Sequence, residues 1–282
     1  MPVSAGLLSS RTGPRYRIDN HSHHPSGMYA RYFHDRLDFF ADALVDRPPA
    51  DAGPTVAGAN LVDGGALDTL LSAYAQAHGI NDRRAAATDW SKFFFARLII
   101  PTVVIQTGAG RPLDLDPAHW QLHYREDGTA AYFVFDREPL IARAAPGDMA
   151  SLIDTVMSPL MAALAADCGL SPRVFASNAA MYYAWALDQL DEQNRAPAAA
   201  RQQARALLEA PKRPNDDGDN PFHAPFKSLA AGARDGNGEP TAECRRLCCV
   251  RDLDPTLALC ANCPRVITYA APADTQATSH VS

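Results

Sequence analysis

Four of the six cysteines in this 282-residue chain lie within sixteen residues of one another. Cys248 and Cys249 are adjacent, and after ten intervening residues Cys260 and Cys263 form a Cys-x-x-Cys pair. A free cysteine packs in a core as a small hydrophobe, and such packing does not require thiols to cluster. Clustered thiols are typical of a metal centre, because several thiolates must converge on iron or zinc. The spacing therefore predicts that these four residues bind metal.

Three kinds of site agree with four clustered cysteines, and the residues alone leave all three open. A [2Fe–2S] cluster takes four thiolates, and its width accommodates the adjacent pair Cys248 and Cys249 if the backbone is kinked there. A structural zinc site prefers two closely spaced pairs, and only Cys260 and Cys263 satisfy that spacing. A disulfide framework is the third alternative, although a chain of 282 residues has no need of such cross-links.

The residues around the cysteines extend the pattern. The chain has Arg-Arg-Leu-Cys-Cys-Val-Arg at 245–251 and Cys-Ala-Asn-Cys-Pro at 260–264. This closely resembles the C-terminal signature of the ferric-siderophore reductases (the FhuF-like family), in which Arg-Arg-x-Cys-Cys precedes Cys-x-x-Cys-Pro at the same spacing. The resemblance implies that Cys248, Cys249, Cys260 and Cys263 hold one [2Fe–2S] cluster.

A looser likeness to the same family extends upstream and covers residues from about 65 to 265. The Asn-Pro-Phe turn at 220–222 resembles an Asn-Pro element that precedes the family's cysteines. Asn178 resembles the asparagine of a Trp-Gly-Asn-like helical motif, although this chain has Phe-Ala-Ser before it. The resemblance implies that Asn178, Arg245 and Arg246 contact the substrate or surround the cluster.

Positive side chains flank the cysteines, and two interpretations of them stay open. Arg245, Arg246, Arg251 and Arg265 lie close to the cysteines in sequence. Positive charge near the sulfurs raises a cluster's reduction potential, and the same charge attracts an acidic partner protein or orients a ferric complex. Alternatively, these arginines form ion pairs with neighbouring acidic residues.

The other cysteines and the histidines give weaker signals. We expect Cys168 to be a core residue, and Cys244 to be a bystander rather than a substitute ligand. Three histidines near the start of the chain form either a polar arm or a surface metal site: His21, His23 and His24. His119 and His123 are four residues apart and share a strand face, but they lack a third ligand.

Composition narrows the function classes. A formal net charge of −6 argues against nucleic-acid binding, which needs a basic surface. The first residues lack the basic and apolar regions of a signal peptide. The most apolar stretch, residues 93–105, is interrupted by Arg97 and Pro101 and is too short to span a membrane. We expect a cytoplasmic protein with at most peripheral contact with the inner membrane.

The periodicity predicts a helix-rich chain with one hairpin. Helical spacing of apolar residues predicts helices over 28–46, after Asp63 to near Gly79, from a cap at Thr88 or Asp89 through Pro101, and over 147–168, 172–194 and 197–210. Apolar runs at 120–124 and 130–135, joined through Asp-Gly, predict a β-hairpin, to which 113–115 adds a third strand. Residues 211–240 are rich in Pro, Gly, Asp and Asn and predict a long loop.

These elements predict an α+β fold, with a helical body, a small antiparallel sheet and a C-terminal iron–sulfur segment. We divide the chain into an N-terminal region (1–64), a body (65–240), a cluster-binding segment (241–270) and a tail (271–282). The resemblance supports the helical body, which the family shares with part of the siderophore synthetases.

The resemblance implies one-electron reduction of Fe(III) in a siderophore, of the hydroxamate type, with release of Fe(II) in the cytoplasm. The sequence has no dinucleotide fingerprint or phosphate-binding loop, so we expect a separate electron donor such as a ferredoxin or reductase. The alternative is a non-enzymatic iron–sulfur or zinc protein whose centre is structural or senses redox state. A siderophore-binding or biosynthetic module is a further alternative, but that class needs an ATP site.

Overall fold

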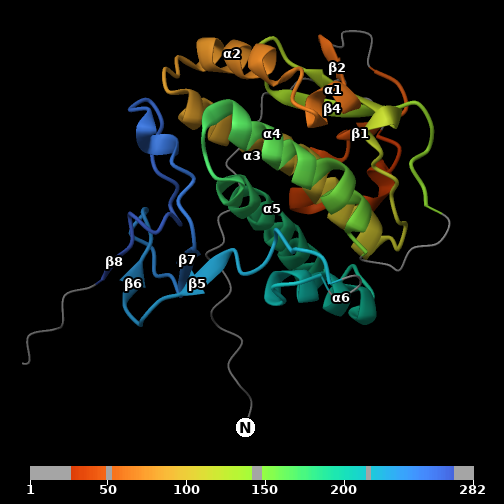
Figure 1. Cartoon of the computed structure of the whole chain (residues 1–282). Coiled ribbons are helices and arrows are strands. Elements are labelled where there is room, and N and C mark those ends of the chain that lie inside the picture. Colours follow the sequence, from red (N-terminus) through yellow and green to blue (C-terminus); the bar gives the residue numbers. More distant parts are fainter. Residues whose placement is uncertain (1–26, 49–52, 142–147, 214–216, 270–282) are drawn as a thin grey trace, which may run out of the picture.

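The computed structural model is an α+β fold, as the sequence predicts. A helical body carries a small sheet at one end and a unit of short strands at the other (Figure 1). The structure describes residues 27–48, 53–141, 148–213 and 217–269. The three histidines at 21, 23 and 24 and the tail from 271 lie outside the described residues.

The body is built from long helices whose apolar faces meet in one core. Its helices are α1 (Gly58–Val62), α2 (Leu67–His78), α3 (Arg83–Val103), α4 (Ser158–Cys168), α5 (Pro172–Glu192) and α6 (Ala198–Glu209). Helix α3 packs most extensively against α5 and is buried along most of its length. Its aromatic residues Trp90, Phe94 and Phe95 are fully buried in the core.

Local signals explain where these helices begin and end. Helix α2 ends at Gly79, which adopts the left-handed conformation (φ 64°) common after a helix. Helix α3 begins earlier than predicted, because Asp82 is its N-cap and accepts hydrogen bonds from the amides of Arg84 and Ala85. The predicted cap was wrong because Thr88 donates to the Ala85 carbonyl within the helix.

The body sheet has four strands in the order β1-β4-β3-β2. The predicted hairpin is confirmed as β3 (Trp120–Tyr124) and β4 (Ala130–Phe135), which pair antiparallel. Strand β2 (Thr55–Ala57) adds to β3 antiparallel, and β1 (Leu44–Val45) adds to β4 in parallel. The third strand predicted at 113–115 was wrong, because Leu113 makes only an isolated bridge and its amide bonds the Gln106 side chain.

The single helix predicted over 28–46 was also wrong. This stretch forms two 3-10 turns, η1 (Ala30–Tyr32) and η2 (Asp35–Phe40), before it enters β1. Between them His34 is extended and Asp35 has a positive φ of 53°, which interrupts any continuous helix. The apolar residues Phe33, Leu37 and Phe40 are nevertheless buried. The apolar pattern therefore predicted which residues are buried, but not the secondary structure that buries them.

One described segment, Ser151–Cys168, is long and apolar enough to pass a length-and-composition test for a membrane span. It consists of the π-helical turn η5 (Ser151–Met157) followed by α4. Buried core helices pass the same test, and 44% of this segment is buried in the fold. Helix α4 packs against α1, α2, α3 and α5, as a core helix does.

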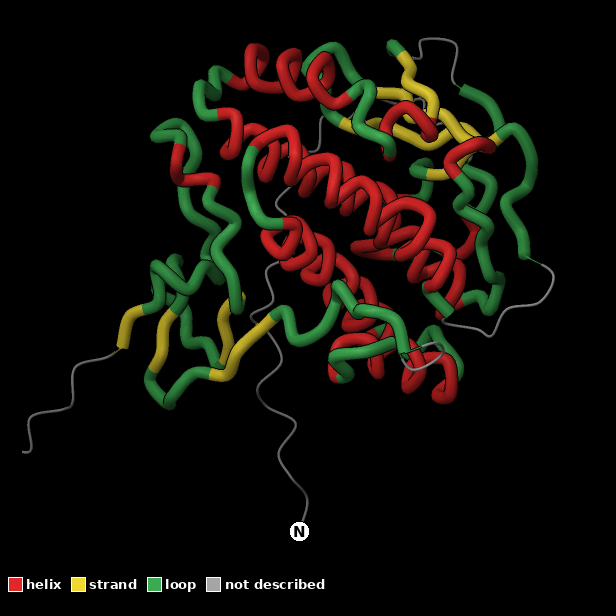
Figure 2. Tube along the Cα trace, viewed as in Figure 1, coloured by secondary structure: helices red, strands yellow, loops and turns green. Residues whose placement is uncertain are grey.

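The cysteines lie in a separate unit of short strands connected by loops (Figure 2). Strand β5 (Phe226–Ser228) pairs with β7 (Glu243–Arg245), and β6 (Ala233–Arg234) pairs with β8 (Thr268–Tyr269), both antiparallel. A 3-10 turn, η6 (Arg251–Leu253), packs against α3 of the body. We call residues 226–269 the cysteine unit.

Candidate metal centre

The backbone is kinked directly after the adjacent cysteines, as a shared site for both thiols requires. Val250 adopts a left-handed conformation with φ 49°, which is rare for a β-branched residue. Its amide lies 3.3 Å from the Cys248 sulfur, to which it donates. On the other side of the site, the amide of Cys263 donates to the carbonyl of Cys260 at 3.0 Å and closes the Cys-x-x-Cys turn.

The four sulfur atoms lie in two close pairs. Cys249 Sγ is 3.6 Å from Cys260 Sγ, and Cys248 Sγ is 3.5 Å from Cys263 Sγ. A tetrahedral metal with bonds of about 2.3 Å to sulfur holds two thiolates about 3.8 Å apart. Each pair therefore has nearly the spacing of two ligands on one metal. Among the described residues, no group of three or more His, Cys, Asp or Glu side chains is arranged to hold a single metal ion.

The thiols have strongly perturbed acidity. Hydrogen bonds with Cys248 and Cys260 lower the pKa of Cys249, and the positive charges of Lys92 and Arg245 lower it further. The hydrogen bond with Cys249, together with burial, raises the pKa of Cys260 to about 12. A separate hydrogen bond between Cys248 and Cys249, together with burial, raises the pKa of Cys248. Cys249 is thus favoured as a thiolate, the form that binds metal.

Arg245 points from β7 into the body and is 1% exposed. Its Nη2 atom donates to Asn178 Oδ1 at 2.6 Å and to Ser177 Oγ at 3.2 Å. Its Nε and Nη1 atoms are buried without a hydrogen-bond partner among the described residues. Leaving buried cationic N–H groups unpaired is costly, so this arrangement fits a negatively charged group beside the sulfurs.

Asn178 connects three elements through its amide. From α5 its Nδ2 atom donates to the Thr88 carbonyl and to Ser91 Oγ on α3, both at 3.2 Å, while its Oδ1 atom accepts from Arg245 on β7. The structure therefore brings together Asn178 and Arg245, two of the residues singled out from the sequence. The third, Arg246, is exposed.

Charged residues that the sequence analysis did not assign to the site complete it. Lys92 on α3 donates from Nζ to Cys260 Sγ at 3.5 Å. Asp89, one turn earlier on α3, pairs with Lys92 at 3.7 Å and with Arg251 at 3.2 Å. The only sequence signal was the pair of charges at i and i+3 on a largely apolar helix, which does not identify the distant partner.

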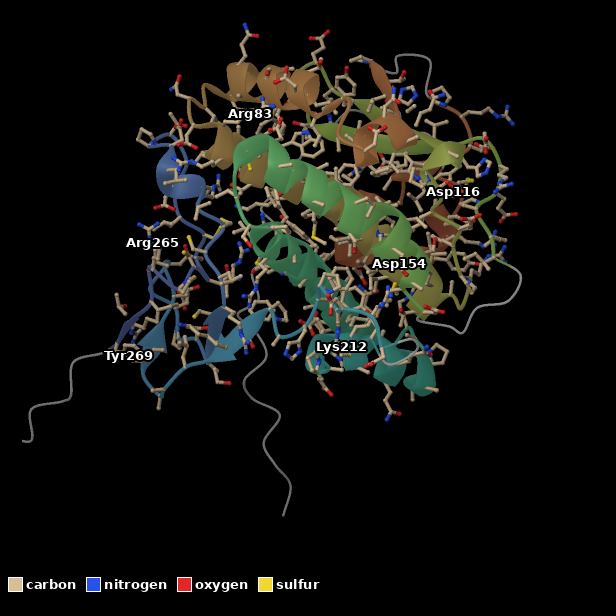
Figure 3. The ribbon with its side chains drawn as sticks, viewed as in Figure 1. Arg83, Asp116, Asp154, Lys212, Arg265 and Tyr269 are labelled. Atoms are coloured by element: carbon tan, nitrogen blue, oxygen red, sulfur yellow. The ribbon has the colours of Figure 1, made fainter. Side chains whose placement is uncertain are left out.

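The remaining candidates lie outside this group. Cys244 is fully buried in β7, and burial raises its pKa. Cys168 packs partly buried against the core, as predicted. His119 lies 3.2 Å from Asp136, and His123 is buried in β3, so neither joins the cysteines. Arg265, labelled in Figure 3, is the exception, because it pairs with Asp252 and also donates a hydrogen bond to Cys248, which raises the pKa of Arg265.

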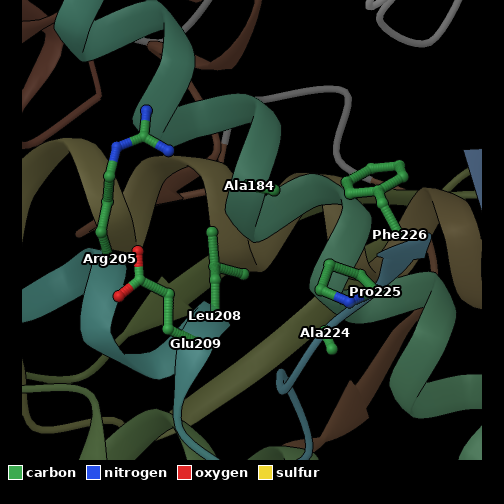
Figure 4. A pocket seen from close by; sticks show the side chains of 7 residues that line it. All are labelled: Ala184, Arg205, Leu208, Glu209, Ala224, Pro225 and Phe226. Carbon is green, nitrogen blue, oxygen red and sulfur yellow. The ribbon is translucent and has the colours of Figure 1, made fainter. Parts of the chain in front are cut away.

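A cavity of about 320 Å³ lies between α5, α6 and the start of the cysteine unit (Figure 4). Leu208, Pro225 and Phe226 form its apolar wall. Its cationic residue, Arg205, is already held by Asp188 and Asp191. The cavity adjoins β5, whose Phe226 is the register partner of Arg245, so it lies close to the cysteines without containing them.

The fold and site define an α+β protein with a helical body and a cysteine-rich centre docked on it. The family model described as "Ferric iron reductase FhuF-like transporter" matches residues 88–233, just over half of the chain. The chain therefore belongs to the FhuF-like ferric iron reductase family. The matched region begins within α3 and continues through α6 and β5, and the four cysteines follow it in sequence.

Partial matches among solved structures include two aerobactin synthetases. ATP-bound aerobactin synthetase IucA from a hypervirulent pathotype of Klebsiella pneumoniae has 15% identity and a TM-score of 0.48, covering 60% of this chain and 37% of that one. Aerobactin synthetase IucC from the same source has 16% identity and a TM-score of 0.44, covering 62% and 37%. This chain thus spans little more than a third of their length. No curated protein matches the sequence.

Proposed function

We propose that this protein is a ferric-siderophore reductase, which delivers one electron to Fe(III) in a hydroxamate-type siderophore so that iron leaves as Fe(II). The observation that carries this proposal is the arrangement of Cys248, Cys249, Cys260 and Cys263 as two close pairs in a chain of the FhuF-like family. Siderophore oxygens bind Fe(III) far better than Fe(II), so reduction releases the metal without breaking the ligand.

The cofactor that we propose is a [2Fe–2S] cluster held by these four cysteines. When bound, such a cluster supplies electrons one at a time, which suits the single-electron reduction of Fe(III). The paired sulfurs fit two metals, and the unpartnered N–H groups of Arg245 fit added negative charge beside them. In this proposal Asn178 fixes the Arg245 guanidinium, and Arg245 in turn orients the site.

The electron donor in this proposal is a separate acidic protein such as a ferredoxin or a reductase. Arg246 is exposed on the cysteine unit and presents positive charge near the centre, although the whole chain is acidic, while the exposed Arg265 is paired with Asp252. Charge of opposite sign steers such partners together. We place this reaction in the cytoplasm, with peripheral contact with the inner membrane, and we assign cluster binding to the segment 241–270.

The proposal is tested with protein purified without oxygen. We expect about two irons and two sulfides per chain and absorption between about 400 and 500 nm. The reduced protein should be reoxidised by a ferric hydroxamate complex in stopped-flow mixing. The gallium complex of the same siderophore is the control, because Ga(III) has the same coordination but accepts no electron. Absent iron, or reduced protein that the ferric complex leaves unchanged, would refute the proposal.

A second candidate function is a non-enzymatic protein whose centre is structural or senses redox state. It is favoured by the small apolar core of the cysteine unit, whose buried apolar residues are Ala233, Cys244, Cys249 and Cys263. A metal commonly stabilises so small a unit. Matched variants test whether the cysteine centre carries the activity: Cys263→Ser should lose metal and reductase activity, whereas Cys168→Ser should keep both. A colourless zinc-loaded protein would favour the second candidate.

A further inference from the structure

Lys92 connects the helical body directly to a predicted metal ligand. Its Nζ atom lies 3.5 Å from Cys260 Sγ, although the two residues are 168 positions apart. The Lys92 side chain is only 12% exposed. A charge that is largely removed from water is screened little by salt and acts strongly on its neighbours. The positive charge of Lys92 therefore acts on any group that Cys260 binds.

Asp89 holds Lys92 in place and opposes its charge. Its carboxylate lies 3.7 Å from Lys92 Nζ and 3.2 Å from Arg251 Nη2, and its side chain is 9% exposed. The Tyr74 hydroxyl donates to the same carboxylate at 2.9 Å and fixes its orientation. One buried carboxylate thus positions two cations, of which Lys92 comes from the body and Arg251 from the cysteine unit.

We propose that Lys92 is a positioning residue that raises the reduction potential of the metal centre, and that Asp89 limits this effect. The inference rests on the proposed function, in which Cys260 is a ligand of a [2Fe–2S] cluster. Adding an electron makes such a centre more negative, and its potential is set by net charge and by hydrogen bonds to the sulfurs. Lys92 supplies both a positive charge and an N–H donor, while Asp89 supplies negative charge.

The test compares midpoint potentials of three variants, titrated anaerobically and followed by absorption. Lys92→Gln should favour the oxidised form about tenfold, a fall of about 59 mV for a one-electron couple. Lys92→Arg keeps the charge and a donor and should stay close to the natural protein. Asp89→Asn removes the opposing charge and should shift the potential upward. A lower midpoint potential in Lys92→Gln and a higher one in Asp89→Asn would not arise if both residues had only a structural role.

Lys212→Gln is the matched control. This lysine is exposed, pairs with Asp219 and lies beside α6, away from the cysteine unit (Figure 3). Its potential should equal that of the natural protein. An unchanged potential in iron-loaded Lys92→Gln overturns the inference, and if that variant fails to fold, an unchanged or lowered potential in Asp89→Asn overturns it instead. Absence of iron from the natural protein would overturn the proposed function itself, which is a distinguishable result.

Discussion

Val250 occupies a backbone conformation that valine rarely adopts, directly after the two adjacent cysteines. A non-glycine residue held in the left-handed region costs on the order of 1–3 kcal/mol, and such strain concentrates at functional sites. Here it has a visible result, because the turn lets Cys248 and Cys249 each pair with a different distant cysteine. The strain thus contributes to the geometry of the centre.

Val250→Gly should therefore stabilise the protein. Glycine adopts a positive φ without steric cost, so we expect the free energy of unfolding to rise by about 1 kcal/mol, measured by urea denaturation. Val56→Gly is the control, because Val56 lies in strand β2, where glycine is unfavourable. Equal destabilisation by both substitutions would show that Val250 is not strained.

Asn178→Ala should destabilise the protein considerably. The substitution removes the acceptor of Arg245 and the donor to Thr88 and Ser91, all in a buried setting. A hydrogen bond to a charged group contributes about 1.5–3 kcal/mol, so a loss of about 3 kcal/mol in the free energy of unfolding is expected. The exposed Gln202→Ala on α6 provides the control and should change little. A loss below about 1 kcal/mol would contradict the role of Asn178 as a buried connector.

At the scale of elements, the cysteine unit is fastened to the start of α3. Asp254 is 1% exposed and accepts hydrogen bonds from the amides of Asn81 and of Asp82, the α3 N-cap, as well as from Thr256. Hydrogen bonds from Thr256, and then from the Asn81 amide, lower the pKa of Asp254 from 3.8 to about 2. A carboxylate at this end of a helix also interacts favourably with the helix dipole.

This contact should give the protein a defined response to acid. The folded-state pKa of Asp254 is lowered, so its stabilising contribution is complete above the unfolded value and is lost as pH falls from about 4 to 2. The difference in urea midpoint between natural protein and Asp254→Asn should be largest near pH 6 and shrink below pH 4. The exposed Asp46→Asn is the control, and a difference that stays constant with pH would contradict the assignment.

Elements with strong local signals could be predicted from the sequence. Short-range rules predict helix α2 with Gly79 at its end, and helix α5 with Ser171 as its N-cap and Pro172 as its first residue. They also predict the Asp-Gly hairpin. The stretch 28–46 could not, because helical spacing records only which residues are buried, whereas the turn at Asp35 depends on tertiary packing. The four cysteines were found from spacing, but Lys92 was not, since its partner lies 168 residues away.

At the scale of the whole molecule, two parts of very different character are joined. The body buries a continuous core of aliphatic and aromatic side chains, whereas three of the four buried apolar residues of the cysteine unit are cysteines. A unit with so little apolar burial needs an additional source of stability, and a metal supplies one. The stability of the two parts should therefore respond differently to metal.

Removal of metal should loosen the cysteine unit and leave the body folded. After anaerobic chelation, limited proteolysis read by mass spectrometry should cut within 226–269 at least about tenfold faster, because the bound metal stabilises only the folded unit. Cleavage within α3 and α5, which form the buried centre of the body, should stay slow and serves as the internal control. Uniform loss of protection along the chain would contradict this division.

The contacts of Arg245 and Asp254 also have a consequence for biogenesis. Their partners, Asn178 on α5 and Asn81 before α3, are synthesised before Arg245 and Asp254. Domains generally fold from the N-terminus during synthesis. The helices of the body can thus fold first, and the cysteine unit can then pack against them. Delivery of metal by the cellular assembly machinery would then be the last step of maturation.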